Sequence, residues 1–234
     1  MRINGTAQHE QPASRAVGPA LRGATGSGLR ARSTAYALFS ELTRSPFRPD
    51  GSVIALPPAD LPELLAELGR ELPFALDAFA LADAAAGLCE TDGAALAAEY
   101  SSLFEVGQPG PPVAIREGLM QGDGRQVLEE VVRYYDFFGY RLDAIEQWCP
   151  DHLSIELEFL HLLALRHDAG DRDDPQHLLA SRDFLCRHLL AWLPAAAAAV
   201  RERSPGSWWQ LLWDCLHRYL ESDRLWLTTT LEGH

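Results

Sequence analysis

Apolar residues recur every three or four positions along most of the chain. Leu153, Leu157, Leu160 and Ala164 form one such stripe, which is the spacing of an amphipathic helix. Alternation of apolar and polar residues, the sign of a strand, is not convincing anywhere. The pattern therefore predicts an all-α protein, one compact helical domain of about nine or ten helices. These helices are expected to begin near Ser33, Asp60, Pro73, Asp92, Gly124, Asp151, Asp174, Pro194 and Ser207.

The N-terminal stretch does not share this pattern. Residues 1–30 are rich in Gly, Ala, Ser, Pro and Arg and contain few large apolar side chains. Such a segment cannot bury enough surface to offset the entropy lost on ordering. We therefore predict a disordered N-terminal tail over residues 1–30 and a helical domain over residues 31–234, with Ser33 capping its first helix.

A second interruption is the Gly/Pro-rich segment over residues 107–118. It is long for a connection inside a compact domain, and such long loops are usually either functional or disordered. Its prolines lower the entropy that the loop would lose on clamping a ligand. Val113, Ile115, Leu119 and Met120 add apolar area in and just after the loop. The segment is therefore a candidate site for an extended or helical hydrophobic peptide.

Charge is distributed unevenly along the chain. The formal net charge is −13, but residues 1–32 carry five arginines and one glutamate, so the remainder carries −17. A strongly acidic body argues against nucleic-acid binding, which needs a basic patch. It would favour a basic partner, and solubility alone is the alternative explanation.

The cysteines and the runs of apolar residues indicate the cellular compartment in which the protein is expected. Cys89, Cys149, Cys186 and Cys215 form no C-x-x-C motif and are expected to be small core residues in a reducing cytoplasm. No run of apolar residues reaches the ~18 positions of a membrane span, and the N-terminus does not read as a secretory signal. We therefore expect a cytoplasmic protein without a membrane span.

The polar residues of the 150–159 segment are the main candidates for function. Pro150 precedes Asp151 and His152, and Glu156 follows one turn later. A proline followed by an aspartate typically stops one element and starts the next, so Asp151 is predicted to cap the helix. The alternative is that Asp151 is only a cap and that His152 satisfies a neighbouring loop.

A metal site receives little support. Glu158 and His161 form an E-x-x-H pair, the spacing found in di-iron bundles. Such a site requires a second E-x-x-H, and the nearest substitute is Asp214 with His217. We expect neither a metal nor another cofactor, and no nucleophile or phosphate-binding motif indicates an enzyme.

Three blocks of sequence together resemble one known family. They are E-Y-x-x-L-F at residues 99–104, P-D-H-L-x-x-E-L-E-F at 150–159 and F-L-x-x-H-L-x-x-W-x-P at 184–194. This order resembles the TorD/DmsD/NarJ family of molybdoenzyme maturation chaperones over residues 33–203. The motif V-G-x-x-G-P-P-V with a following R-E-G, at 106–118, is most similar to chaperones of type II dimethyl-sulfoxide-reductase-like enzymes.

The resemblance implies a function and a partner. It implies a compact all-α, TorD-like chaperone, a monomer or a helix-exchanged dimer, without catalytic activity. Its partner would be the apo catalytic subunit of a molybdenum enzyme, bound through a twin-arginine leader or N-terminal segment before cofactor insertion and export. A ferritin-like metalloprotein and a helical scaffold without a peptide groove are the alternatives. Direct binding of nucleotide or molybdopterin is left open.

The resemblance also implies which residues bind the leader peptide. In the family, the Gly/Pro loop and the Asp-His helix start border the recognition groove. The matching residues here are Gly110, Pro111, Pro112, Asp151, His152 and Glu156. The chain departs from the common P-[YW]-x-S pattern after the loop, so the aromatic part of the groove is unassigned. Asp151 is expected to pair with a basic segment of the partner.

Overall fold

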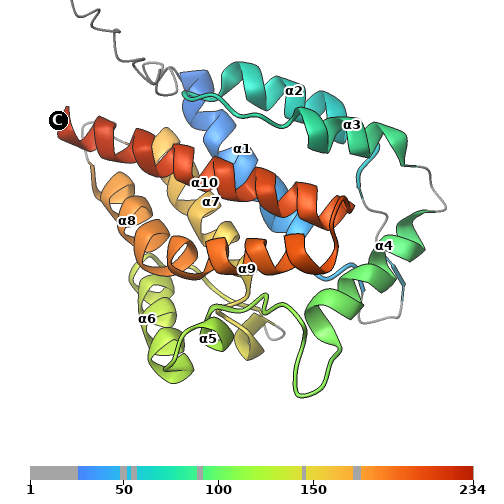
Figure 1. Ribbon diagram of the computed structural model, residues 1–234. Helices are drawn as coiled ribbons and strands as arrows, with labels where there is room; N and C mark the ends of the chain where they lie inside the picture. Colours follow the sequence, from blue (N-terminus) through green and yellow to red (C-terminus); the bar gives the residue numbers. More distant parts are fainter. Residues whose placement is uncertain are drawn as a thin grey trace, which may run out of the picture.

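The computed structural model describes residues 26–47, 52–53, 57–88, 92–143, 146–170 and 175–233. Over these ranges the chain is helical, with two isolated β-bridges and no strand. The all-α prediction is thus confirmed. The helices of Figure 1 are α1 (Gly26–Thr43), α2 (Leu61–Glu71), α3 (Phe79–Gly87), α4 (Asp92–Tyr100), α5 (Glu117–Met120), α6 (Gly124–Phe137), α7 (Leu153–Ala169), α8 (Gln176–Phe184), α9 (Leu190–Arg203) and α10 (Trp208–Glu232). Short helical segments are Ser101–Glu105 after α4, Glu146–Trp148 before α7 and Leu185–Leu189 between α8 and α9.

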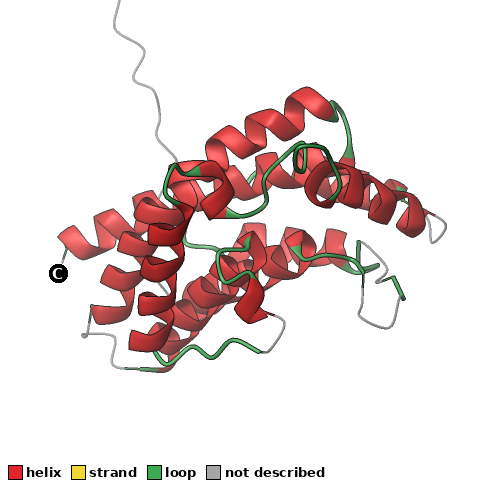
Figure 2. Cartoon of the chain, turned by 90° about the horizontal axis from the view of Figure 1, so that it is seen from below, coloured by secondary structure: helices red, strands yellow, loops and turns green. Residues whose placement is uncertain are grey.

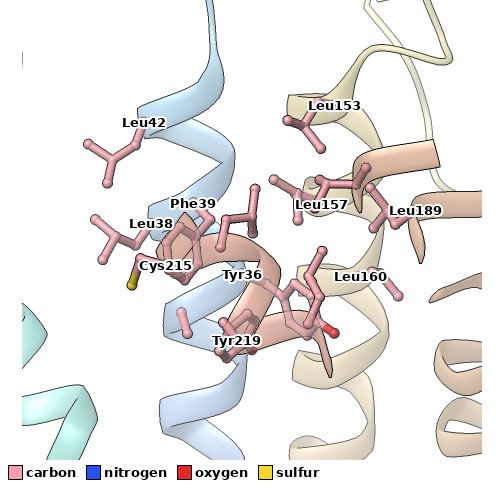
Figure 3. Packing of buried hydrophobic residues seen from close by; sticks show 14 of the residues in the cluster. Tyr36, Leu38, Phe39, Leu42, Leu153, Leu157, Leu160, Leu189, Cys215 and Tyr219 are labelled. Atoms are coloured by element: carbon pink, nitrogen blue, oxygen red, sulfur yellow. The ribbon is translucent and has the colours of Figure 1, made fainter. Parts of the chain in front are cut away.

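The core is built where α1 lies along α7 and α10 crosses both (Figure 1). The apolar stripe of α7 faces this core: Leu153, Leu157 and Leu160 are completely buried. Figure 3 shows them opposite Tyr36 of α1, with Tyr219 of α10 packed against the same cluster. The periodicity that predicted α7 is therefore the periodicity of its buried face.

A buried ion pair fastens α1 to α10. Both Arg32 and Asp223 are fully buried, and the guanidinium donates from Nε at 2.6 Å and from Nη2 at 2.9 Å to the two carboxylate oxygens. Tyr36 Oη donates to the same carboxylate at 2.7 Å. The Arg32 guanidinium also lies 4.4 Å from the ring centroid of Trp226, a cation–π distance. This cluster joins the first and last helices of the fold.

The start of α1 differs from the prediction. The helix begins at Gly26, so residues 26–30, which were assigned to the tail, are helical, and Ser33 is not its cap. Ser33 is buried within the helix, with its hydroxyl 3.0 Å from His161 Nδ1 of α7. Small and apolar residues such as Gly28 and Leu29 pack inward here, so tertiary packing extends the helix beyond the polar residue. The predicted tail over residues 1–25 lies outside the described residues.

A second departure concerns Pro194, which was expected to start a helix. Residues 176–203 instead form one helical stretch, with a π-helical segment at Leu185–Leu189 and Pro194 inside α9. Proline removes one helical hydrogen bond, and burial of Leu193 and Ala196 on either side offsets that loss. Within the described residues, this is the one stretch long and apolar enough to cross a membrane, and half of its most apolar window is buried. Core helices share that property, and α8 and α9 pack against α10.

The cysteines are not all core residues as predicted. Cys215 is buried, Cys149 is half-buried and Cys186 is exposed; all three are free thiols. The apolar stripe of α8 continues through Phe184 and Leu185, and the following residue turns outward. Cys89 lies outside the described residues.

Candidate functional site

The Gly/Pro loop and the start of α7 meet through the backbone. Glu117 N donates to the carbonyl of Asp151 at 3.0 Å, and Leu153 N donates to the carbonyl of Ile115 at 3.0 Å. These bonds form an antiparallel bridge between Arg116 and His152. Two segments that the sequence singled out separately are therefore one structural unit, at the end of the molecule that carries α5 and α6 (Figure 1). Figure 2 views the molecule from below and shows helices joined by loops, with no strand drawn among the described residues.

Asp151 holds this unit together from inside. Its side chain is fully buried and accepts from Arg116 Nε at 3.0 Å and from Gly118 N at 3.0 Å. A Cβ on Gly118 would lie 2.9 Å from Asp151 Oδ2 and 3.3 Å from the backbone of Gly124, so only glycine allows this close approach. The carboxylate is therefore engaged by the chain's own Arg116.

The cap of α7 is His152, and the prediction of Asp151 for that role was wrong. His152 Nδ1 accepts from Ser154 N at 3.2 Å, whereas the Asp151 carboxylate is directed to Arg116 and Gly118. Burial lowers the pKa of His152 to about 4; the Asp151 carboxylate opposes this shift, and Arg116 and Arg44 add to it. A neutral imidazole is what the cap requires, because a protonated ring has no acceptor nitrogen.

Glu156 lies behind the unit with a second glutamate, Glu117 of α5. Glu156 is fully buried and neither of its carboxyl oxygens has a hydrogen-bond partner. Its pKa is raised well above the usual range, first by burial and then by the Glu117 carboxylate and Asp151. Glu117 is also buried and has His188 Nδ1 at 3.0 Å. Burial and these neighbouring carboxylates therefore disfavour the charged form of Glu156.

The remaining predicted residues line an open hollow on the surface. Gly110, Pro111 and Pro112 border a cavity of about 480 Å³, with Leu119 and Arg203 on its other sides. The loop closes tightly on itself, because a Cβ on Gly107 would lie 2.0 Å from the carbonyl of Gly110. Its far end is anchored by Val113 N donating to the Leu103 carbonyl at 2.9 Å. The hollow thus has a fixed wall of backbone and proline rings.

Among the exposed apolar side chains near this unit, Trp148 and Val106 were not predicted as site residues, whereas the apolar area of Leu119 and Met120 had been singled out in the sequence. Trp148 has 83% of its surface exposed and stands just before Pro150. Leu119 and Met120 on α5 are 57% and 38% exposed, and Val106 at the start of the loop is 66% exposed. The available signal was Trp148, a large aromatic residue among polar ones directly before the Asp-His pair. Of these residues Leu119 lines the hollow itself, and exposed apolar and aromatic side chains of this kind are typical of a protein-binding surface.

The E-x-x-H pair serves the fold. Glu158 accepts from Arg44 Nη2 at 2.7 Å, and His161 Nδ1 lies 2.8 Å from the carbonyl oxygen of Ser33. In the described part of the chain, no group of three or more His, Cys, Asp or Glu side chains could hold a metal ion. The helix face of Phe184, His188 and Trp192 is buried, as expected of a packed face.

Comparison with known proteins gives several relatives. The chain is 44% identical over 104 residues to the chlorate reductase assembly chaperone protein of Ideonella dechloratans, covering 42% of this chain and 54% of the relative. Identity and coverage are the same for the selenate reductase assembly chaperone protein of Thauera selenatis. The chaperone protein TorD of Vibrio cholerae is 31% identical over 109 residues, covering 44% of this chain and 48% of the relative. The chain thus spans about half the length of the curated relatives it matches, and no solved structure matches it.

A family model describes a longer part of the chain. Residues 63–198 match the nitrate reductase delta subunit family, and this range runs from α2 to α9. It contains the Gly/Pro loop, the start of α7 and the buried acidic residues. The match covers more than half of the chain and agrees with the resemblance to TorD/DmsD/NarJ chaperones seen in the sequence. The chain therefore belongs to the nitrate reductase delta subunit family.

Proposed function

We propose that this protein is a non-enzymatic, cytoplasmic assembly chaperone that binds the apo catalytic subunit of a molybdenum enzyme. The observation that carries the proposal is the fixed Gly/Pro hollow joined to the start of α7 and accompanied by exposed Leu119, Met120 and Trp148. The family match and the names of the relatives support the chaperone role. The free thiols agree with a reducing compartment.

Peptide capture is the mode of binding that this surface favours. Gly110, Pro111 and Pro112 offer a preorganised wall, which lowers the entropy lost on binding. Exposed Leu119 and Trp148 offer the apolar and aromatic anchors that carry most of the energy in protein interfaces. Asp151 and Glu156 are buried, so we assign them, with the cap His152, to positioning this surface and not to contacting the partner.

The names of the relatives support a finer proposal for the partner. The chlorate and selenate reductase chaperones point to a type II dimethyl-sulfoxide-reductase-like catalytic subunit. We propose that its N-terminal segment, with or without a twin-arginine leader, is the part that is bound. The acidic body of the chain favours a basic segment.

The test is capture from the native host, followed by titration of the captured subunit's N-terminal segment. The captured protein is expected to be a molybdenum-enzyme catalytic subunit. Leu119→Ser should weaken binding of the segment roughly tenfold, the effect of truncating an interface anchor. Leu179→Ser is the matched control, because Leu179 is also exposed, at 42%, but lies on α8 away from the hollow. Equal affinity for both variants, or no captured subunit, would favour a helical scaffold without a peptide groove.

A further inference from the structure

The exposed apolar residues of α5 depend on an element that is a single helical turn. The helix spans Glu117–Met120, and its last two residues are exposed. A helix this short is not stable by itself, so tertiary contacts decide where it lies. On one side its start is held by Gly118 N, which donates to the buried Asp151 carboxylate. On another side a cavity of about 260 Å³ separates it from the segment Leu185–Leu189, so apolar packing does not close that side.

Glu117 is the side chain that ties α5 to the fold on the side of this cavity. Its carboxyl group is 1% exposed, and His188 Nδ1 lies 3.0 Å from one oxygen and 3.2 Å from the other. Gln121 Nε2 donates to the first of these groups as well, but it follows α5 directly and moves with it. Among the described residues, His188 is therefore the hydrogen-bond partner that joins the Glu117 carboxyl group to a distant part of the fold. This contact exists whichever of the two groups carries the proton.

The His188 ring is held firmly enough to act as an anchor. It is 2% exposed, with the Phe184 ring centroid at 4.7 Å and the Tyr134 ring edge-on at 5.6 Å. It also lies in the π-helical segment Leu185–Leu189, and π-helical turns are frequent at functional sites. The neighbouring Glu156 carboxyl oxygens take part in no hydrogen bond, so they do not replace His188 as the partner of Glu117.

The geometry points to His188 as the positioning residue of α5: its Nδ1 fixes Glu117 and thereby the place of Leu119 and Met120 on the surface. Without this contact a buried carboxyl group loses its partner, which is costly. The single turn can relieve that cost by moving, because the cavity beside it leaves room. The role differs from that of a packed helix face, since it depends on one ring atom and not on the bulk of the ring. That the two apolar residues contact a partner rests on the proposed function.

Three substitutions separate the ring atom from the bulk of the ring. His188→Phe keeps an aromatic ring against Phe184 and Tyr134 but has no nitrogen. His188→Asn places its amide near the position of Nδ1, whereas His188→Gln places it near that of Nε2. A positioning role through Nδ1 therefore predicts that asparagine preserves the place of α5 and that phenylalanine and glutamine do not.

The sequence supplies a selective probe of α5. The chain has two methionines, Met1 and Met120, so ¹³C-methyl-methionine labelling of the full chain reports on this turn. In His188→Phe and His188→Gln the methyl signal of Met120 should shift, and exchange of the Gly118 amide proton should become about tenfold faster relative to the amides of α7. In His188→Asn both should stay close to the parent.

The matched control is His161→Phe. His161 Nδ1 also lies at hydrogen-bond distance from another element, 2.8 Å from the Ser33 carbonyl oxygen, but it joins α7 to α1, so the Met120 signal should not move. Equal behaviour of His188→Asn and His188→Phe, or an unmoved Met120 signal in both, would overturn the role of Nδ1. If His188→Phe does not fold, the same contact is tested from α5, where Glu117→Gln should keep the Met120 signal and Glu117→Met should shift it.

The second arm uses the captured N-terminal segment of the partner. His188→Phe should weaken its binding about fivefold in the parent and much less in a chain that already carries Leu119→Ser, because both changes act through α5. Weaker binding with α5 unmoved overturns the positioning role and leaves the proposed function standing. A displaced α5 with unchanged affinity supports His188 as its anchor and overturns α5 as the surface that the partner contacts.

Discussion

Two fully buried carboxyl groups, Asp223 and Glu156, are held in opposite ways. Asp223 accepts three hydrogen bonds, two from Arg32 and one from Tyr36. Glu156 accepts no hydrogen bond at either carboxyl oxygen. The charged group with the largest effect on its pKa is another carboxylate, that of Glu117. Asp223 is therefore fastened by three hydrogen bonds, whereas the surroundings of Glu156 raise its pKa and disfavour its charged form.

The two carboxyl groups lie in different parts of the molecule. Asp223 joins α1 to α10 in the core, where Tyr36, Phe39 and Phe74 all pack around Tyr219. Glu156 supports the unit of loop, α5 and α7 start, next to exposed apolar residues and two surface cavities. Buried polar groups that lack partners are destabilising and are typically retained where function needs them. Among the described residues such groups occur in both parts: the Glu156 carboxyl oxygens beside the loop, and Arg32 Nη1 and the Trp209 and Trp213 indole nitrogens in the core.

The largest expected effect comes from breaking the buried ion pair between Arg32 and Asp223. Asp223→Asn leaves the Arg32 guanidinium buried without its counter-charge, which costs about 3–5 kcal/mol. Urea unfolding followed by circular dichroism measures this loss as a fall in midpoint. Glu221→Gln on the same helix is the control: Glu221 pairs with Arg224 at the surface, so its loss should stay below about 1 kcal/mol. Equal losses in the two variants would show that Asp223 fastens nothing.

A smaller loss is expected in the unit formed by the loop and the start of α7. Asp151→Asn keeps an acceptor for Gly118 N but removes the charge that faces Arg116, which is 30% exposed. We expect a loss of about 1–2 kcal/mol of unfolding free energy and weaker binding of the partner segment through a displaced loop. Because the charge is buried, adding salt should not reproduce the binding defect. If Asp151→Asn were as stable as the parent but bound the segment less tightly, and if added salt changed that loss, Asp151 would instead contact the partner directly.

The sequence was most informative where a regular helical spacing of apolar residues determined the structure. The stripe of Leu153, Leu157 and Leu160 predicted α7 and its buried face, because helical spacing and burial are the same geometric fact. The start of α1 and the passage through Pro194 could not be predicted in this way. Both depend on packing partners distant in sequence, which override the local preference for a cap or a break.

For the candidate site, the sequence identified the right segments but not the roles of their residues. The loop and the Asp-His pair were both singled out, and the backbone bridge between them confirms that they belong together. Which of Asp151 and His152 caps α7 depends on Arg116 and Gly118, more than 30 positions away. The pairing of Glu117 with His188 across 71 positions likewise had no local signal. Whether the predicted residues bind the partner stays a prediction.

The comparison between Asp223 and Glu156 can be tested through pH, by replacing Glu156 with glutamine. The pKa of Glu156 is raised by burial and then by Glu117, so its proton stays bound in the folded chain after the unfolded chain has released it. The contribution of Glu156 to folding stability is therefore fully present below pH 4.5, the pKa of this group in the unfolded chain. This contribution is lost as pH rises toward the pKa of Glu156 in the folded chain. Glu156→Gln cannot titrate, so it should melt at a higher temperature than the parent at pH 8, with the gap closing at pH 4. The control is Glu158→Gln, because Glu158 forms a part-exposed pair with Arg44, and its melting temperature relative to the parent should not show this trend with pH. A difference in melting temperature between Glu156→Gln and the parent that stays constant with pH would contradict the raised pKa of Glu156.

The smallest effect is expected at the cap of α7, and its pH dependence has the opposite sign. The pKa of His152 is lowered from 6.5 to about 4, chiefly by burial, so the unfolded chain takes up a proton at a pH where the folded chain does not. The contribution of His152 is therefore present above pH 6.5 and is lost as pH falls toward 4. His152→Asn keeps a good capping acceptor but does not titrate, so it should match the parent within about 1 kcal/mol at pH 8 and exceed it at pH 5. His217→Asn on α10 serves as the control histidine. Parallel melting curves for the parent and His152→Asn from pH 8 to pH 5 would mean that His152 is protonated in the folded chain, and the cap would then need another acceptor.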